Sequence, residues 1–394
     1  MARTKVLLVH HRPELGGAPT SLAYLARHLD RARFDVAAYA PPGASARLLA
    51  EAGARVHTGP VAGFTHIWAS TYRGARWLLL GRELARLAPH ALRLRRVLRE
   101  ERPDVVHLND SPLVAAAVLA RLARARVVWH LRASLPGDGR DLRSRLLARA
   151  IGRLAHRAVA INEDVAASFA AAGDVAVVFN AVDLERFAPG DPAAARRELG
   201  LPEAAPLAAY VGFLYPRKGF RELLDAFARV QREVPDARLV LAGGGVRRGR
   251  RLGGLVPDHE AEARELAAAR GLADAVTFLP YTERPELVYR AADVVVAPSR
   301  GPELGRPVLE GAAAGRPVVA TGSMTGGGVL RDGETGLLAR ADSPESLAEA
   351  LAALLRDAER REAMGRAARE HAVAAFGPAR AAARIAALYE EVLR

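Results

Sequence analysis

The sequence predicts an α/β protein made of two Rossmann-like, doubly wound domains. Short apolar runs rich in valine alternate with amphipathic helical patterns along most of the chain. This alternation is typical of parallel βαβ units with helices on both faces of a sheet. The alternation is interrupted at residues 183–206 and then starts again. A chain of 394 residues also exceeds the usual size of one compact domain.

The first series of elements occupies the N-terminal half of the chain. The run KVLLVH (5–10) predicts a buried strand, and TSLAYLARHL (20–29) predicts the helix that follows it. Further strands are predicted at 34–40, 54–59, 103–109, 125–131, 156–162 and 175–180.

Residues 183–206 contain several prolines and are predicted to be a linker. We therefore expect an N-terminal domain over 1–185 and a C-terminal domain over 186–375. After a Gly-Pro break, a helix at 376–394 either caps the second domain or crosses back to the first. Ligands bind beyond the carboxyl ends of such strands, so a cleft faced by both domains is the expected site. The second series of strands is predicted at 207–213, 237–244, 275–280, 293–299, 316–321 and 335–340.

The composition limits the classes of function. The chain has no cysteine, which excludes disulfides, thiolate metal sites and cysteine nucleophiles. The net charge is +13, but no basic run is interleaved with aromatic residues, so we expect no nucleic-acid partner. The apolar run at the N-terminus is too short for a signal peptide, and no apolar stretch is long enough to span a membrane. We expect a cytoplasmic protein.

The basic segment 72–104 has two interpretations. It could lie on anionic lipid at the inner face of the membrane, or it could be an arginine-rich surface helix packed on its own domain. We favour the second. The partner of another basic run, RRGRR (247–251), is not identified by the sequence.

The turn LYPRKGFRELLDAF (214–227) is a candidate phosphate site. It places Arg217 and Lys218 after a predicted strand and just before a helix, whose N-terminus carries partial positive charge. Two cations beside a helix start could hold a diphosphate. The residues alone favour this reading and a solvated basic turn equally.

The segment GPELGRPVLEGAAAGRPVVATG (301–322) places two carboxylates around the start of a helix. The helix is predicted to begin near Arg306–Val308, where free backbone amides could bind phosphate or sugar hydroxyls. Glu310 lies one turn further in and could accept two hydrogen bonds from a ribose. The alternative is that Glu303 only favours the helix dipole and Glu310 is solvated, although an alanine-rich helix between buried strands offers Glu310 little solvent.

Several motifs occur in the order known from one enzyme family. They read VGFLYPRKG, LAGGGV, VTFLPY, ADVVVAPSRGPELGRPVLEGAAAGRPVVA and LRDGETGLLA. This order resembles the donor domain of the retaining glycosyltransferases of family 4, which have the GT-B fold. Upstream, AINEDVAASFAAAG and FNAVDLERFAP resemble the end of that family's first domain. The resemblance covers nearly the whole chain and includes the final helix.

The resemblance implies a nucleotide-sugar site in the second domain. Arg217 and Lys218 would hold the diphosphate, Glu310 the ribose, and the strand end at Leu279–Tyr281 would face the base. It implies no metal and no cofactor, because the two cations neutralise the leaving group and the nucleotide sugar is a substrate; the chain also has no Asp-x-Asp pair. The donor-binding candidates are Gly16, Gly17, Gly212, Arg217, Lys218, Leu279, Tyr281, Ser299, Gly305, Arg306, Pro307, Val308 and Glu310.

Two segments depart from the family pattern. The first glutamate of the family would fall on Pro302, and Glu303 follows it by one residue. Either the turn is shorter by one residue and brings Glu303 to the same place, or the sugar-facing carboxylate is missing. We favour Glu303 as the sugar-facing carboxylate. The glycine-rich run GSMTGGG (322–328) also replaces a helix start of the family.

The first domain supplies fewer candidates. Gly16 and Gly17 follow the first strand, where the family approaches the donor phosphates and the acceptor, although a plain tight turn is a serious alternative. His130 matches a family position near the reacting sugar and is taken as a catalytic candidate with Arg217, Lys218 and Glu303. His10, His11 and His107 also follow or end strands and are weaker candidates.

The sequence therefore predicts a retaining glycosyltransferase that moves a sugar from a nucleotide-diphosphate donor to an acceptor hydroxyl. The acceptor could belong to an envelope lipid, a polysaccharide or a small metabolite. One alternative is a catalytically silent nucleotide-sugar binder on the same scaffold. Another is a nucleic-acid or lipid-surface binder driven by charge, whose association would depend strongly on salt.

Overall fold

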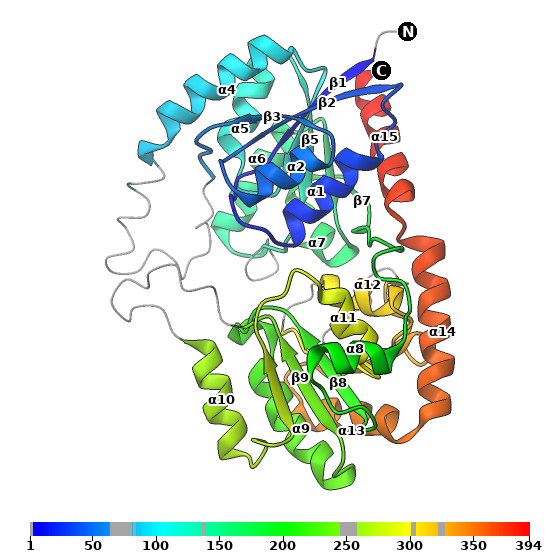
Figure 1. Cartoon of the computed structure of the whole chain (residues 1–394). Coiled ribbons are helices and arrows are strands. Elements are labelled where there is room, and N and C mark those ends of the chain that lie inside the picture. The colour runs from blue at the N-terminus through cyan, green and yellow to red at the C-terminus, as the bar shows by residue number, and fades with distance from the viewer. Residues whose placement is uncertain are drawn as a thin grey trace. The chain divides into compact units, whose positions relative to one another are not determined.

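The protein folds into two α/β units. The computed structural model describes residues 3–63, 81, 84–135, 139–244, 258–300, 305–321 and 328–394. One unit consists of residues 1–181 and 378–394, and the other of residues 182–377. Each unit contains a parallel sheet with helices packed on it (Figure 1). The predicted pair of Rossmann-like domains is confirmed.

In the first unit the described strands pair in the order β3-β2-β1-β4-β5-β6-β7, and all neighbours are parallel. The strand order reverses between β1 and β4, where such sheets bind ligands. The strands are β1 (Thr4–Val9), β2 (Phe34–Ala40), β3 (Arg55–Thr58), β4 (Val105–Asn109), β5 (Arg126–Leu131), β6 (Arg157–Ala160) and β7 (Val175–Val177). The helices are α1 (Gly17–His28), α2 (Ala44–Glu51), α4 (Leu87–Glu101), α5 (Val114–Leu122), α6 (Leu142–Leu154), α7 (Glu163–Ser168), the 3₁₀ turn η3 (Ala170–Ala172) and α15 (Pro378–Leu393).

The apolar residues of the first sheet alternate between two cores. Leu7 and Val9 pack into the core that contains α4, α5 and α6, whereas Val6 and Leu8 pack into the core that contains α1, α2 and α15. This follows from the two-residue period of a strand, which sends successive side chains to opposite faces. Since both faces are covered by helices, the strand sequences are almost continuously apolar.

The last helix of the chain, α15, belongs to the first unit. It packs against α1, and Ile385, Leu388 and Tyr389 are buried in the same core as Leu8. The hydroxyl of Tyr389 is hydrogen-bonded to Nδ1 of His107 on β4 at 2.8 Å, within the protein interior.

The second unit repeats the topology, with the described strands in the order β10-β9-β8-β11-β12-β13. Its strands are β8 (Leu207–Val211), β9 (Arg238–Ala242), β10 (Val276–Leu279), β11 (Val294–Ala297), β12 (Val318–Thr321) and β13 (Gly336–Ala339). Its helices are α8 (Pro192–Leu199), the 3₁₀ turn η4 (Pro216–Lys218), α9 (Phe220–Glu233), α10 (His259–Ala269), α11 (Pro285–Ala291), α12 (Arg306–Ala313), α13 (Pro344–Arg356) and α14 (Ala358–Ala375).

The prediction of a linker over 183–206 is wrong, because α8 lies within it. Asp191 caps this helix by accepting the N–H of Ala193, Pro192 occupies its first turn, and Gly200 ends it in a left-handed conformation. These residues favour helix termini, so the prolines mark a helix start and not an unstructured connection. Arg196 of α8 is 4% exposed and is paired with Asp293 at 2.8 Å, which fixes the helix to the domain.

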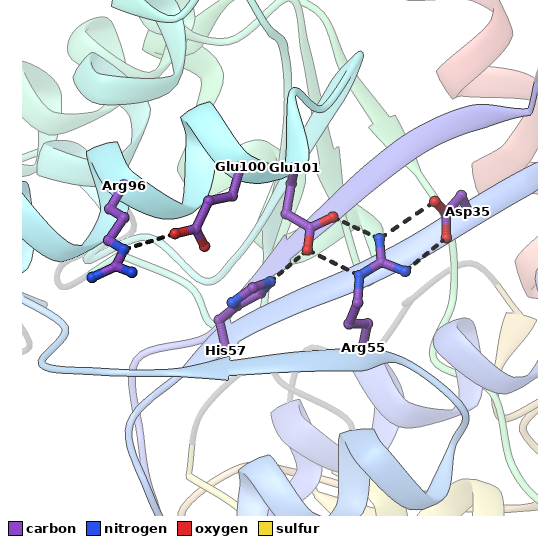
Figure 2. A network of polar contacts seen from close by, with 6 residues as sticks. All are labelled: Asp35, Arg55, His57, Arg96, Glu100 and Glu101. Carbon is purple, nitrogen blue, oxygen red and sulfur yellow. Dashed lines mark hydrogen bonds and ion pairs between the residues drawn. The ribbon is translucent and has the colours of Figure 1, made fainter.

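The edge strand β3 is attached to α4 by a polar network (Figure 2). Arg55 donates to both carboxylate oxygens of Glu101 at 2.9 and 2.6 Å, and His57 lies 2.5 Å from the same carboxylate. On its apolar side α4 buries Leu94 and Val97 in the core of its own unit. For this described part of the basic segment 72–104, the interpretation as a surface helix packed on its own domain is confirmed. Residues 72–80 and 82–83, like the run 247–251, lie outside the described residues.

Candidate functional site

The carboxyl edge of the second sheet brings the predicted phosphate-binding cations next to the segment after β11. Arg217 and Lys218 form the turn η4 between β8 and α9. Gly219 follows with φ of 75°, and a side chain there would collide with the carbonyl oxygen of Pro298, so the turn requires glycine. The carbonyl oxygen of Arg217 accepts the N–H of Arg300 at 3.0 Å and the hydroxyl of Ser299 at 3.5 Å.

Lys218 also lies beside the start of α12. A methyl group placed on Gly305 would be 3.6 Å from Nζ of Lys218. Gly305 is the N-cap residue and Arg306 the first residue of the helix, where the sequence predicted it. The ammonium group and the positive end of the helix dipole therefore lie close together, which concentrates positive charge at this point.

Two of the residues at this helix start offer no free amide to a ligand. Pro307 has no N–H, and the N–H of Val308 donates to the carbonyl oxygen of Gly305 at 3.2 Å. The side chain of Val308 is 1% exposed and belongs to the interior. The positive charge of this site therefore comes mainly from side chains and the helix dipole.

Glu310 is buried and held in place by two side chains. Its carboxylate accepts the hydroxyl of Tyr289 at 2.8 Å and Nε of Arg306 at 2.8 Å, and Glu310 is 7% exposed. Burial and the neighbouring Glu310 carboxylate raise the pKa of Tyr289 well above its usual value, so the phenol stays protonated and can donate. The prediction that Glu310 is not solvated is confirmed. Sequence analysis missed Tyr289, which looks like one more apolar position of α11.

An aromatic surface lies beside the same edge. Tyr281, just after β10, is stacked on Phe213 with ring centroids 6.0 Å apart and planes within 7°. Tyr281 is 39% exposed, so part of its surface is open to a flat ligand such as a nucleobase. Gly212, just after β8, and Leu279, the last residue of β10, lie at the same ends of their strands.

In the first unit, the carboxyl edge carries a buried polar network. Nε of Arg132 donates to the side-chain oxygen of Asn109 at 2.7 Å, and Nη1 donates to Asn180 at 2.8 Å. The amide nitrogen of Asn109 lies 3.1 Å from Nδ1 of His10. Burial, reinforced by the nearby His11, Arg12 and Arg132, lowers the pKa of His10 to about 3. The network therefore carries a guanidinium charge beside a neutral histidine.

His130 is more enclosed than the sequence predicted. It lies on β5, is 4% exposed, and its ring packs edge-on against His107 with centroids 5.3 Å apart. Neither ring nitrogen has a hydrogen-bond partner among the described residues. The ring lines a cavity of about 20 Å³ between α1 and α15, which has room for about one water. Burial, helped by Arg132 and His107, lowers its pKa well below the usual value, so the imidazole is neutral.

Asp110 is a candidate that sequence analysis missed. It follows β4 with φ of 109°, a left-handed conformation that costs energy for a residue with a side chain. Its N–H donates to the carbonyl oxygen of His130 at 2.8 Å, and its carboxylate accepts the N–H of Ser111 at 2.8 Å. Burial raises the pKa of the Asp110 carboxyl. Strained backbone and a perturbed acid at a strand end are typical of functional sites.

The remaining predicted residues are placed as follows. Gly16 is the N-cap residue of α1 and Gly17 its first residue, and a side chain on Gly16 would meet open space. Glu303 and Pro302 lie outside the described residues, as does the run 322–327. Among the described residues there is no group of three or more His, Asp or Glu side chains that could hold a metal ion. None of the helices in the described ranges is long and apolar enough to cross a bilayer.

The two sheets and their carboxyl-edge residues define a protein with paired Rossmann-like domains, and both domains match known families. Residues 15–186 match the family described as Glycosyltransferase Family 4, and residues 192–371 match Glycosyl transferases group 1. The chain belongs to the group 1 and family 4 glycosyltransferases.

Curated relatives of the chain are also named glycosyltransferases. The chain is similar to the D-inositol 3-phosphate glycosyltransferase of Kribbella flavida, with 42% identity over 204 residues, which is 50% of this chain and 46% of the relative. The protein of that name from Nocardia farcinica is 41% identical over 204 residues, again 50% of this chain and 43% of the relative. The matched region spans about half the length of these relatives.

Solved structures share the fold over the whole chain. The Anabaena protein HepE, crystallised with UDP and glucose, has a TM-score of 0.81 and 22% identity, covering 99% of this chain and 100% of HepE. Sucrose-phosphate synthase from Thermosynechococcus elongatus has a TM-score of 0.76 and 22% identity, with 99% of each chain covered. At this identity the likeness concerns the fold, and it confirms the predicted GT-B class.

Proposed function

We propose that the protein is a retaining glycosyltransferase that transfers a sugar from a nucleotide-diphosphate donor to an acceptor hydroxyl. The observation that carries this proposal is the meeting of Lys218 with the start of α12, one turn before the buried carboxylate of Glu310. A diphosphate needs concentrated positive charge, and a ribose needs a fixed acceptor of hydroxyl hydrogen bonds. Both groups stand at the carboxyl edge of one sheet.

The donor would lie along the edge of the second unit. The Arg217 and Lys218 side chains would hold the diphosphate, Glu310 the ribose, and Tyr281 the base. As the glycosidic bond breaks, negative charge grows on the departing diphosphate, and the two cations with the helix dipole would stabilise it without a metal ion. The leaving phosphate could take the proton of the acceptor hydroxyl, so a side-chain base is not required.

The acceptor would bind to the first unit. Gly16 permits close approach of a ligand at the start of α1. His130 could form a hydrogen bond with a group that enters the cavity it lines. The relatives named as D-inositol 3-phosphate glycosyltransferases support a small hydroxylated metabolite as acceptor. The complexes of HepE with UDP and with UDP-glucose support a uridine nucleotide as donor. Glu303 remains the proposed sugar-facing carboxylate, and cytoplasmic location remains part of the proposal.

Replacement of Lys218 tests the proposal. Lys218→Ala should lower kcat by about 100-fold or more, because one charged donor to the leaving group is lost. Lys5→Ala is the matched control, since Lys5 is the other lysine of the chain and lies exposed on β1. The measurement is release of UDP from UDP-glucose with inositol phosphates and other polyols as acceptors.

Two outcomes would contradict the proposal. Unchanged turnover in Lys218→Ala would exclude Lys218 as a group that stabilises the departing diphosphate. Thermal stabilisation by UDP or UDP-glucose, without release of UDP by the parent chain in any acceptor mixture, would favour the catalytically silent binder.

A further inference from the structure

The second unit contains a cavity of about 550 Å³ whose lining includes none of the proposed donor-site residues. It is lined by α14, the turn after α12 and the start of α8, with Asp293 and Arg316 preceding β11 and β12. The strands are parallel, so these residues mark the amino edge of the sheet, whereas Lys218 and Ser299 follow strands at the carboxyl edge. The cavity is therefore separate from the proposed donor site.

Three partly buried arginines line this cavity and have only neutral partners. Arg316 donates to the carbonyl oxygen of Arg290 at 2.8 Å. Arg361 donates to two carbonyl oxygens at the end of α13 at 2.8 Å. Arg369 donates to the carbonyl oxygens of Leu184 and Ala313. Within the described residues, none of the three forms an ion pair, and Nε of Arg316 is buried without a hydrogen-bond partner.

The carboxylates of the cavity neutralise these charges only in part. Asp293 is already bound by Arg196 at 2.8 Å and by the N–H of Leu207 at 2.7 Å. Glu362 and Glu370 are exposed residues of the rim. Glu362 lies 3.9 Å from Arg366, a fourth lining arginine, and the two exposed side chains form an ion pair with each other at the surface.

The pKa values of two of these arginines are lowered, which shows that holding their charge here costs free energy. Burial lowers the pKa of Arg316, and the neighbouring Arg196 and Arg361 contribute to the lowering, while Asp293 opposes it. Burial also lowers the pKa of Arg369. Keeping these guanidinium groups partly buried and close together costs free energy, and an anion bound in the cavity would offset that cost.

We propose that this cavity binds a phosphorylated small molecule. Planar guanidinium groups donate in pairs to phosphate oxygens, and three of them in a concave site suit an anion with more than one negative charge. A volume of about 550 Å³ lies in the range of small-molecule sites and exceeds the need of a single inorganic ion. The site is independent of the proposed transfer reaction.

The test uses inorganic pyrophosphate as probe and calorimetric titration of the full chain. An Arg217→Ala/Lys218→Ala double variant serves as background, so that the proposed donor site cannot contribute the signal. We expect one pyrophosphate to bind, more weakly as salt is raised. Adding Arg316→Gln or Pro192→Glu should weaken binding by about tenfold.

The second variant keeps the proposal testable if Arg316→Gln fails to fold. Pro192 is an exposed lining residue in the first turn of α8, where a glutamate is tolerated. Ala194→Glu, on an exposed position of α8 outside the cavity, is the control of equal charge and should bind as the background does. Equal affinities of Pro192→Glu and Ala194→Glu would overturn the proposal. The proposal would also be overturned if the parent chain bound pyrophosphate and the Arg217→Ala/Lys218→Ala variant did not, because the anion would then belong to the donor site.

Discussion

The carboxylate of Glu310 shows how a residue acquires a role from its neighbours. An isolated glutamate on a helix has many rotamers, but here Tyr289 and Arg306 each donate to one of its oxygens. Each carboxylate oxygen has a further lone pair, so the group can still accept hydroxyl hydrogen bonds from a ligand. Tyr289 therefore acts as a positioning residue for the proposed ribose contact.

Tyr289→Phe removes that hydrogen bond without changing the ring. We expect KM for the donor to rise by about tenfold with a much smaller change in kcat, because the leaving group keeps both cations. Tyr39→Phe is the control, since the hydroxyl of Tyr39 also donates a hydrogen bond, partly buried, to the carbonyl oxygen of Pro60 in the first unit. Both variants should lose similar stability by calorimetry. A KM unchanged by Tyr289→Phe would remove Tyr289 from the site.

Among the single residues of the candidate site, the sequence predicted those that lie at the ends of strands and helices. Arg217, Lys218 and Glu310 could be found because a cation pair or a carboxylate is unusual where a strand meets a helix. Tyr289, Asn109 and Asp110 could not, because their roles depend on contacts between elements distant in sequence or on one backbone angle. The enclosure of His130 was hidden for the same reason, since α15 supplies part of the wall.

Among the elements, the attachment of β3 to α4 depends on one carboxylate. The hydrogen bond from Arg55, with a smaller contribution from His57, lowers the pKa of Glu101 to about 2, although partial burial opposes it. A carboxyl with a lowered pKa stabilises the fold above its ordinary pKa. That stabilisation is lost as the pH falls from about 5 towards 2.

Glu101→Gln should therefore lower the free energy of unfolding of the first unit by about 1 kcal/mol at pH 7, with a smaller difference from the parent near pH 3. Calorimetry over a pH series measures both effects. Glu100→Gln is the control: Glu100 is paired with Arg96 on the exposed side of α4 (Figure 2), and we expect little change from it. A difference between Glu101→Gln and the parent that did not vary with pH would contradict the role of the charge.

The strands were the elements most easily predicted, because strands covered on both faces are continuously apolar and are bounded by polar turns. The helix α8 was missed because its capping residues, Asp191, Pro192 and Gly200, are also the residues of loops. Its burial depends on Arg196 reaching Asp293, a partner 97 residues away that no local pattern reveals.

For the molecule as a whole, the buried histidines are distributed unequally. Six described histidines have a lowered pKa, mainly through burial, and all six belong to the first unit: His10, His11, His90, His107, His130 and His156. A histidine that must stay neutral when folded takes up a proton on unfolding. Stability is therefore fully present above about pH 6.5 and is lost as the pH falls below it, by about 1.4 kcal/mol per pH unit for each deeply buried ring.

We therefore expect acid to unfold the first unit before the second. Trp129 is a buried residue of the first unit, so the fluorescence of a variant with Trp68 and Trp77 replaced by phenylalanine reports on that unit. Its unfolding temperature should fall markedly between pH 7 and pH 5. Hydrogen exchange of peptides from residues 182–377, corrected for intrinsic rates, should change less. An equal loss of protection in both units would contradict this expectation.

The return of α15 to the first unit has a consequence for biosynthesis. Translation completes the first sheet long before it reaches Ile385, Leu388 and Tyr389, which cover part of one of its faces. Helices α1 and α2 already cover part of that face, but the part that α15 covers stays exposed while the second unit is being made. We expect the second unit to reach its native state before the first, and chaperones to bind the first unit until α15 has been synthesised.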